Sequence, residues 1–305
     1  MIILQMLKRK SIQGIYMETT KRILVIGGAG FVGSNLIKKL LEQGHDVISM
    51  DNYSTGSHDN EHKGCHYYFG TPKDLLPALE NHHKKLDYIF HLGEYARVEQ
   101  SFEDYDKVME YNHECFPYVL EFAKQQDAKL IYSGSSTKFA EGGGKSMSPY
   151  AYTKAQNTEL LQRYSEWFEL DYAIVYFYNV YGDNEIGSGK YATVVAKFLN
   201  MVKEGQKILP VTSPGTQLRN FTHINDIIDG LILAGFKGKG DGYGIGSDES
   251  YSILDLVDML GVQTRLTPAK PGNRMNGQLK TKQLKELGWS PKHSLPEYIK
   301  EKLSE

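Results

Sequence analysis

The stretch that decides the fold is Arg22-Ile23-Leu24-Val25-Ile26-Gly27-Gly28-Ala29-Gly30-Phe31-Val32-Gly33. Its apolar run, residues 23–26, predicts a strand buried on both faces, and a helical pattern over residues 31–43 follows it. The four glycines satisfy both G-x-G-x-x-G and G-x-x-G-x-x-G. Side chains at these places would keep a pyrophosphate away from the backbone amides and the positive end of the helix. A dinucleotide is therefore the expected ligand.

A carboxylate follows the second predicted strand. This strand covers residues 45–50 and ends at Asp51. At this place of a dinucleotide-binding unit a carboxylate accepts hydrogen bonds from the adenosine ribose. An acid here would also repel a ribose 2'-phosphate, so NAD is favoured over NADP as the cofactor.

Composition sets the broad class. The 305 residues allow about two domains. A formal net charge of -2 gives no electrostatic case for nucleic acid or membrane binding, and no run reaches the roughly 18 apolar residues of a membrane span. Cys65 and Cys115 lie far apart and outside any metal spacing, which suits a reducing compartment. We therefore expect a cytoplasmic protein without a metal site.

The N-terminus is expected to be an extension. An apolar run is followed by Lys8-Arg9-Lys10, the reverse of the order in a signal peptide. The first strand then starts only five residues after Met17, which itself could begin a chain. We interpret residues 1–20 as a segment that the fold does not need.

Strands and helices alternate along residues 22–180, which predicts βαβ units and a parallel sheet. The expected fold class is α/β: a doubly wound Rossmann sheet with a smaller α/β substrate lobe toward the C-terminus. In chain order, strands are predicted at 22–26, 45–50, 65–69, 88–92, 129–133 and 173–177, and helices at 31–43, 72–81, 104–125 and 150–168.

The second half of the chain divides between the two parts. Residues 21–180 are assigned to the NAD-binding domain, to which residues 222–242 return, and residues 181–305 to the substrate-binding lobe. The lobe includes a helix opened by Ser252, with Asp255 three residues later as a capping box, and a C-terminal part around Leu284, Leu287, Trp289, Leu295 and Tyr298.

Tyr150 and Lys154 carry the predicted chemistry. They are four residues apart in Ser148-Pro149-Tyr150-Ala151-Tyr152-Thr153-Lys154, so on a helix they face the same way, one turn apart. A lysine ammonium beside a phenol stabilises the phenolate, which makes such a phenol usable as a base near neutral pH. Just upstream, residues 133–137 leave the strand predicted at 129–133 as a run of hydroxyls that could hydrogen-bond the oxygen of a reacting carbon.

The chain resembles the extended short-chain dehydrogenase/reductases, in particular the nucleotide-sugar epimerases and dehydratases such as the UDP-glucose/UDP-galactose 4-epimerases. The resemblance covers about residues 22–300. It rests on the glycine loop, the Asp51-Asn52-Tyr53-Ser54-Thr55-Gly56 run, His91-Leu92, residues 148–154, Phe177-Tyr178-Asn179-Val180-Tyr181-Gly182 and Arg219-Asn220-Phe221-Thr222-His223-Ile224-Asn225-Asp226.

The resemblance implies roles for individual residues. Tyr150 would be the base, Lys154 would bind the nicotinamide ribose and Ser135 would complete the catalytic set. Tyr150 and Lys154 would contact NAD together with Gly27, Gly30, Phe31, Val32, Asp51, Asn52, Ser54, Thr55, Gly56 and Leu92. The substrate, a nucleotide-diphosphate sugar, would be bound by Val98, Ser136, Thr137, Asn179 and two diphosphate-clamping arginines, Arg219 and Arg274.

Three departures from the family pattern limit the substrate assignment. Ser136-Thr137 stands where members that remove water across C5 and C6 carry an Asp-Glu pair. Ala96 replaces a serine or lysine that often contacts substrate, and Thr71 replaces an aspartate that often holds adenine, although adenine binding is expected to survive. Glu94 and Arg97 either read an unusual sugar or pair with each other at the rim.

The leading functional hypothesis is NAD-dependent 4-epimerisation of a nucleotide sugar through a transient 4-keto sugar. Alternatives are a C4 dehydrogenase that releases the keto product, a less favoured 4,6-dehydratase and, in another class, a non-catalytic dinucleotide-binding protein. Relatives form a four-helix dimer interface, so a homodimer is expected through helices 104–125 and 150–168, which carry apolar positions at Val108, Phe116, Val119, Phe122, Leu160, Leu161 and Trp167.

Overall fold

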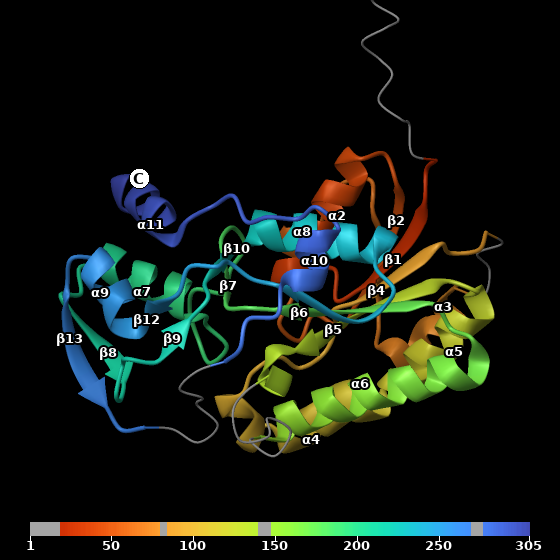
Figure 1. The fold of residues 1–305 in the computed structure, drawn as a ribbon, viewed down its shortest axis with the longest axis horizontal. Helices are drawn as coiled ribbons and strands as arrows, with labels where there is room; N and C mark the ends of the chain where they lie inside the picture. Colours follow the sequence, from red (N-terminus) through yellow and green to blue (C-terminus); the bar gives the residue numbers. More distant parts are fainter. Residues whose placement is uncertain (1–18, 80–83, 140–147, 270–276) are drawn as a thin grey trace, which may run out of the picture.

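A seven-stranded parallel sheet forms the centre of the molecule (Figure 1). The computed structural model describes residues 19–79, 84–139, 148–269 and 277–305. The sheet order β11-β6-β5-β4-β1-β2-β3 places the first strand near the middle and confirms the predicted doubly wound α/β fold. The strands are β1 (Arg22–Ile26), β2 (Asp46–Asp51), β3 (His66–Phe69), β4 (Tyr88–His91), β5 (Lys129–Ser135), β6 (Tyr172–Phe177) and β11 (Gly240–Ile245).

Both faces of β1 are buried. Ile23 and Val25 pack into one core and Leu24 and Ile26 into the other, and no more than 2% of any of these residues is exposed. Since successive strand side chains point to opposite faces, an apolar run of this kind needs helices on both sides of the sheet.

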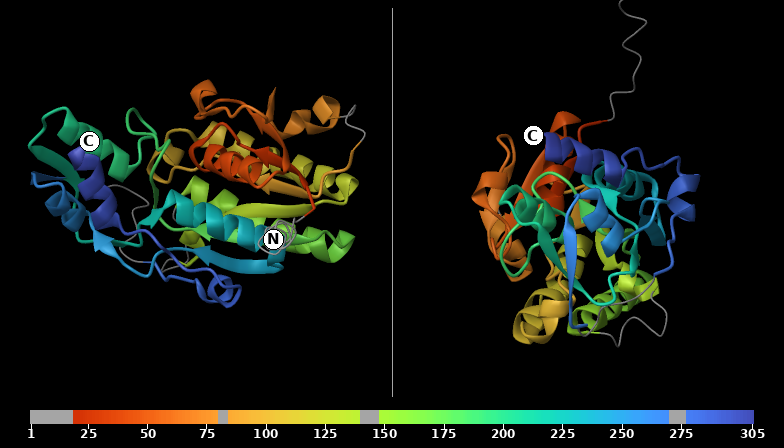
Figure 2. Two further views of the ribbon diagram at one scale, coloured as in Figure 1. Left: turned by 90° about the horizontal axis from the view of Figure 1, so that it is seen from above. Right: turned by 90° about the vertical axis from the view of Figure 1, so that its left-hand side faces the viewer.

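Helices cover the two faces (Figures 1 and 2). On one side lie α2 (Phe31–Glu42), α8 (Ile224–Lys237) and α10 (Lys282–Glu286). On the other lie α3 (Leu75–Leu79), α4 (Tyr105–Val108), α5 (Phe116–Gln126) and α6 (Pro149–Phe168).

The predicted continuous helix over residues 104–125 is wrong. A π-helical turn, η4 (Met109–Glu114), separates α4 from α5. Pro117 lies in the first turn of α5, where its missing N–H leaves no helical bond unmade. Wide turns of this kind often occur near functional sites, and η4 contributes Tyr111 to the cavity described below.

A smaller lobe carries its own apolar core, to which α7 (Val194–Lys203), α9 (Ile253–Met259), α11 (Leu295–Ser304) and β8 (Ile208–Thr212) contribute. The strand β13 (Gln263–Thr267) pairs with β8. Two short strand pairs complete the described sheets: β7 (Val180–Tyr181) with β10 (Thr222–His223), and β9 (Leu218–Arg219) with β12 (Tyr251–Ser252). The predicted capping box of α9 is confirmed, since Ser252 Oγ accepts from the Asp255 amide and Asp255 Oδ2 from the Ser252 amide.

The chain returns to the main sheet after residue 222. α8 packs on it, and β11 extends it beside β6 as far as Ile245. Leu284 and Trp289 also pack into this core, and the Trp289 indole donates to the carbonyl oxygen of Asp226 at 3.0 Å. Leu284 and Trp289 thus pack against the main sheet, whereas the sequence pattern assigns them to the smaller lobe.

None of the helices in the described ranges combines the length and the apolar character that crossing a membrane requires. Within the same ranges no cluster of His, Cys, Asp and Glu has the arrangement of a metal site. Of the predicted N-terminal extension, only residues 19 and 20 belong to the described part of the chain.

Candidate active site

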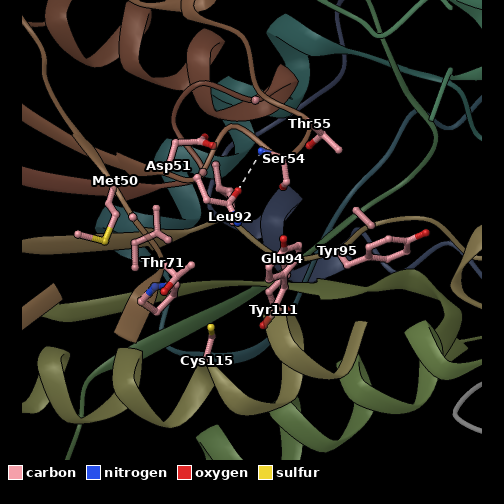
Figure 3. A pocket seen from close by; sticks show the side chains of 18 of the residues that line it. Met50, Asp51, Ser54, Thr55, Thr71, Leu92, Glu94, Tyr95, Tyr111 and Cys115 are labelled. Atoms are coloured by element: carbon pink, nitrogen blue, oxygen red, sulfur yellow. Dashed lines mark hydrogen bonds between the residues drawn. The ribbon is translucent and has the colours of Figure 1, made fainter. Parts of the chain in front are cut away.

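A cavity opens where β1, β2 and β4 end (Figure 3). The space between its walls is about 770 Å³, open solvent at its mouth included. The predicted cofactor residues in its wall are Gly27, Gly30, Asp51, Asn52, Ser54, Thr55 and Leu92. Carboxyl ends of parallel strands at the point where strand order reverses are the usual ligand site of this architecture.

Backbone segments approach each other closely beneath the glycine loop. Gly27 has a φ of +87°, and a Cβ there would lie 2.6 Å from the Gly93 backbone. A Cβ on Gly33 would lie 2.1 Å from the Gly27 carbonyl oxygen. Only glycine fits these two places. The loop therefore presents bare backbone to the cavity at the start of α2, as a pyrophosphate requires.

Asp51 ties the loop to the second strand. Its Oδ2 accepts from the Ala29 amide at 2.9 Å and its Oδ1 from the Tyr53 amide at 2.8 Å. Burial raises the pKa of Asp51, and the two amide hydrogen bonds oppose that rise. The carboxylate thus shapes the site where the ribose is expected.

The other predicted cofactor residues lie around this cavity without lining it. Phe31 and Val32 begin α2 and pack against the core, and Gly56 lies where a Cβ would be 3.0 Å from Ala29. Thr71 does line the cavity, and its amide and hydroxyl both donate to Asp74. Sequence reasoning missed several wall residues, among them Met50 of β2, Tyr111 of η4, Cys115 and Tyr191.

Tyr150 and Lys154 lie in the first two turns of α6, as predicted. The helix starts at Pro149, and Ser148 Oγ caps it by accepting from the Ala151 amide at 3.1 Å. The Lys154 ammonium donates to the Ser133 carbonyl at 2.6 Å. Among the described residues the Tyr150 hydroxyl has no hydrogen-bond partner.

Ser135 ends β5, and its hydroxyl lies 2.8 Å from the Thr137 hydroxyl. Ser136 and Thr137 form the turn after it, and all three residues are buried. The run of hydroxyls predicted after the strand at residues 129–133, which is β5, therefore lies inside the protein.

The idea that Glu94 and Arg97 pair with each other is wrong. Glu94 Oε2 lies 2.7 Å from Lys154 Nζ, and the side chain is 1% exposed. Arg97 Nε and Nη2 donate to the Tyr191 carbonyl, and its Nη1 donates to the Ala96 carbonyl. The Glu94 carboxylate finds its donors on α6 and β5 instead, and the Arg97 guanidinium finds its acceptors in backbone carbonyl oxygens.

The predicted substrate residues are spread over several elements. Val98 precedes the 3₁₀ turn η3 (Glu99–Phe102), Asn179 follows β6 with a φ of +39°, and Arg219 lies in β9. None of these three lines the cavity. Arg274 lies outside the described residues.

Together, the fold and this site are typical of dinucleotide-dependent oxidoreductases with a Tyr-Lys pair beside the cofactor cavity. The chain belongs to the NAD dependent epimerase/dehydratase family, whose model matches residues 23–246. The family assignment confirms the predicted cofactor, NAD, and the predicted class, an enzyme of the extended short-chain dehydrogenase/reductase type.

Several relatives agree with this assignment. The chain is similar to the structure of UDP-glucose 4-epimerase from Thermotoga maritima with UDP-glucose, with 27% identity, coverage of 93% of this chain and 97% of the other, and a TM-score of 0.86. It is also similar to the UDP-glucose 4-epimerase of Thermus thermophilus with NAD, with 26% identity, coverage of 93% and 98%, and a TM-score of 0.83. UDP-glucuronic acid decarboxylase 5 of Arabidopsis thaliana is 28% identical, with 92% of this chain and 88% of the relative covered. Sugar nucleotides thus recur among the relatives, with more than one reaction.

Proposed function

We propose that this protein is an NAD-dependent nucleotide-sugar 4-epimerase. The observation that carries the proposal is the Tyr150–Lys154 pair on α6, beside the cavity. Lys154 contacts Glu94 in the cavity wall, and Tyr150 interacts electrostatically with Arg97, another wall residue. The proposed base, Tyr150, and a cation, Lys154, thus lie beside the expected nicotinamide site.

The residues of this chain would move one proton twice. Tyr150, as phenolate, takes the proton of the sugar C4 hydroxyl and later returns it, while Lys154 stabilises the phenolate and binds the nicotinamide ribose. Ser135 hydrogen-bonds the same sugar oxygen. Bound NAD would supply the acceptor and later the donor of the C4 hydride. A turn of the keto sugar between the two transfers inverts C4, and orientation supplies much of the catalysis.

Ser136 and Thr137 support an epimerase over a 4,6-dehydratase. Water loss across C5 and C6 needs an acid for the leaving hydroxyl and a base for the C5 proton. Both positions carry neutral hydroxyls. These two residues do not separate an epimerase from a C4 dehydrogenase that releases its keto product.

Turnover without added cofactor separates these two functions. We would incubate purified protein with UDP-glucose and follow UDP-galactose by chromatography. An epimerase continues for many turnovers because it regenerates its cofactor, whereas a C4 dehydrogenase stops after one. Y150F should lower the rate at least about a thousandfold and retain NAD. Unchanged conversion by Y150F would contradict the proposed base.

The surroundings of Arg97 support nucleotide-linked uronic acids as further candidate substrates. Arg97 lines the cavity, and among the described residues no carboxylate lies within ion-pair distance of its guanidinium. Burial lowers the pKa of Arg97, and Glu185 is among the groups that oppose this effect from a longer range. A guanidinium in such surroundings suits a sugar carboxylate.

The matched experiment compares UDP-glucuronic acid with UDP-glucose. R97L should lower kcat/KM for the uronic acid at least about tenfold more than for UDP-glucose. R163L serves as the control, because Arg163 pairs with Glu166 on the surface of α6. Equal losses of kcat/KM for both substrates would show that Arg97 does not bind the sugar carboxylate.

The proposal also includes a homodimer through the outer faces of α4, α5 and α6, and a cytoplasmic location. Most of the apolar positions predicted for the interface are buried within the subunit instead: Phe116, Val119, Phe122 and Leu161 pack into the core beneath the sheet, and Val108 is buried as well. The exposed set on these helices supports the interface: Tyr105, Tyr118, Tyr152, Trp167 and Phe168. Cys65 and Cys115 are free thiols, in keeping with a reducing compartment.

A further inference from the structure

A buried ion pair lies at the wall of the cofactor cavity. It joins Glu94, in the loop after β4, to Lys154 of α6, sixty residues later. The Nζ–Oε2 distance is 2.7 Å, and the side chains are 5% exposed at Lys154 and 1% exposed at Glu94. A charged pair so far from water is costly unless both partners are well placed.

The Glu94 carboxylate is surrounded by partners. Its Oε2 also accepts from the Tyr132 hydroxyl at 3.0 Å, and its Oε1 accepts from the Asn157 amide at 2.9 Å. His91 Nε2 lies 3.3 Å from Oε1. Burial by itself would raise the pKa of Glu94, but Lys154 and His91 outweigh burial and lower it. The carboxylate is therefore ionised, and it is fixed in place from four sides.

The partners of Lys154 leave one direction open. An ammonium has three N–H bonds. One is directed to Glu94 and one to the Ser133 carbonyl, 2.6 Å away. The third has no hydrogen-bond partner among the described residues, and it is the N–H that could reach a bound cofactor. Glu94 therefore determines where this third N–H points, although Glu94 lies outside the Tyr-Lys motif.

We propose that Glu94 is a positioning residue of the cofactor site, which orients the Lys154 ammonium and cancels its charge so that the site favours cationic, oxidised NAD over neutral NADH. This inference rests on the proposed function, because an epimerase begins each cycle with oxidised cofactor. A lone lysine cation at this wall would repel a positively charged nicotinamide ring, whereas a neutral pair does not.

The charges near the pair come from several elements. His91 belongs to β4, Tyr132 to β5, Tyr150 to α6, and Arg97 to the loop that carries Glu94. Arg97 bears a permanent charge, and Tyr150 bears one as the phenolate of the proposed reaction. E94Q leaves both groups in place, so the change in net charge arises at Glu94.

The test is the ratio of the dissociation constants for NAD and NADH, measured on cofactor-free protein by calorimetry without any sugar. E94Q should move the ratio about tenfold toward NADH, since it leaves the Lys154 charge uncancelled. E94D, which keeps the charge, should stay near the wild-type ratio. E103Q is the control for an exposed charge, because Glu103 pairs with Lys190 on the surface.

A second variant covers the case in which E94Q does not fold. The double variant E94Q/K154Q removes both charges and leaves the wall neutral. It should weaken the binding of both forms alike and keep their ratio within about twofold of the wild type. An unchanged ratio in E94Q, or a ratio in the double variant that moves toward NADH, overturns the proposal. Because no turnover is measured, failure of this inference is distinguishable from failure of the epimerase assignment.

Discussion

Asp51 Oδ2 accepts a hydrogen bond from the Ala29 amide at 2.9 Å, across the end of the sheet between β1 and β2. Together with the bond from the Tyr53 amide, this contact holds the glycine loop against the strand that supplies the ribose-binding carboxylate. Both oxygens are already used within the chain. The carboxylate therefore builds the cofactor site as well as offering acceptors to a ligand.

Asp51→Asn should weaken NAD binding about tenfold to a hundredfold. An asparagine offers one acceptor and turns an amide donor toward one of the two backbone N–H groups, so that one hydrogen bond is lost. Calorimetric titration of cofactor-free protein measures the effect. D46N, at the exposed start of β2, should bind NAD normally. Equal affinity in D51N and the wild type would remove Asp51 from the site.

Gly30 and Gly33 should respond differently to alanine. A Cβ at Gly30 would lie 3.3 Å from the Gly27 carbonyl, a tight but adjustable contact, whereas at Gly33 the distance to that oxygen would be 2.1 Å. G30A should fold, with a Tm close to the wild type, and bind NAD at least about tenfold more weakly, because the methyl group blocks the pyrophosphate. G33A should fail to fold or lose several degrees of Tm.

The comparison of G30A with G33A decides whether the glycine loop is needed for cofactor binding or only for folding. Thermal unfolding of the cofactor-free variants, followed by NAD titration, gives both quantities. Normal NAD affinity in a folded G30A protein would show that the phosphates lie elsewhere.

His223 should make stability fall in acid. Burial, followed by the stacked His293 ring at 4.3 Å, lowers the pKa of His223 to about 4, and its Nδ1 caps α8 by accepting from the Asn225 amide. The unfolded histidine titrates near 6.5. Between these values the unfolded state binds more protons, so this contribution is complete above pH 6.5 and is lost as the pH falls to 4.

H223N tests this contribution. Asparagine is a good N-cap that does not titrate. The wild type should lose about 2 kcal/mol more of unfolding free energy between pH 7 and pH 4.5 than the variant does. Urea unfolding at both pH values measures the difference. Parallel losses in the two proteins would rule out His223 as the source.

Trp167 should contribute to self-association. It lies on α6 with 62% of its surface exposed, beside Phe168. A charge placed in an apolar interface is costly to bury, so W167E should convert a dimer to a monomer at micromolar concentration. Light scattering gives the molar mass, and K85E, on a surface loop, is the control. A wild type that is monomeric at this concentration would contradict the proposed dimer.

The sequence by itself determined the parallel α/β sheet, the glycine loop, the Asp51 position, the α9 capping box and the Tyr150–Lys154 spacing. Each of these depends on residues close together in the chain, where the periodicity of strands and helices and the small size of glycine leave few alternatives. Only the tertiary structure decided the partner of Glu94, the π turn before α5 and the packing of Trp289 on α8. These depend on which distant elements meet in the core. A buried charge must find its partner there, whatever the separation along the chain.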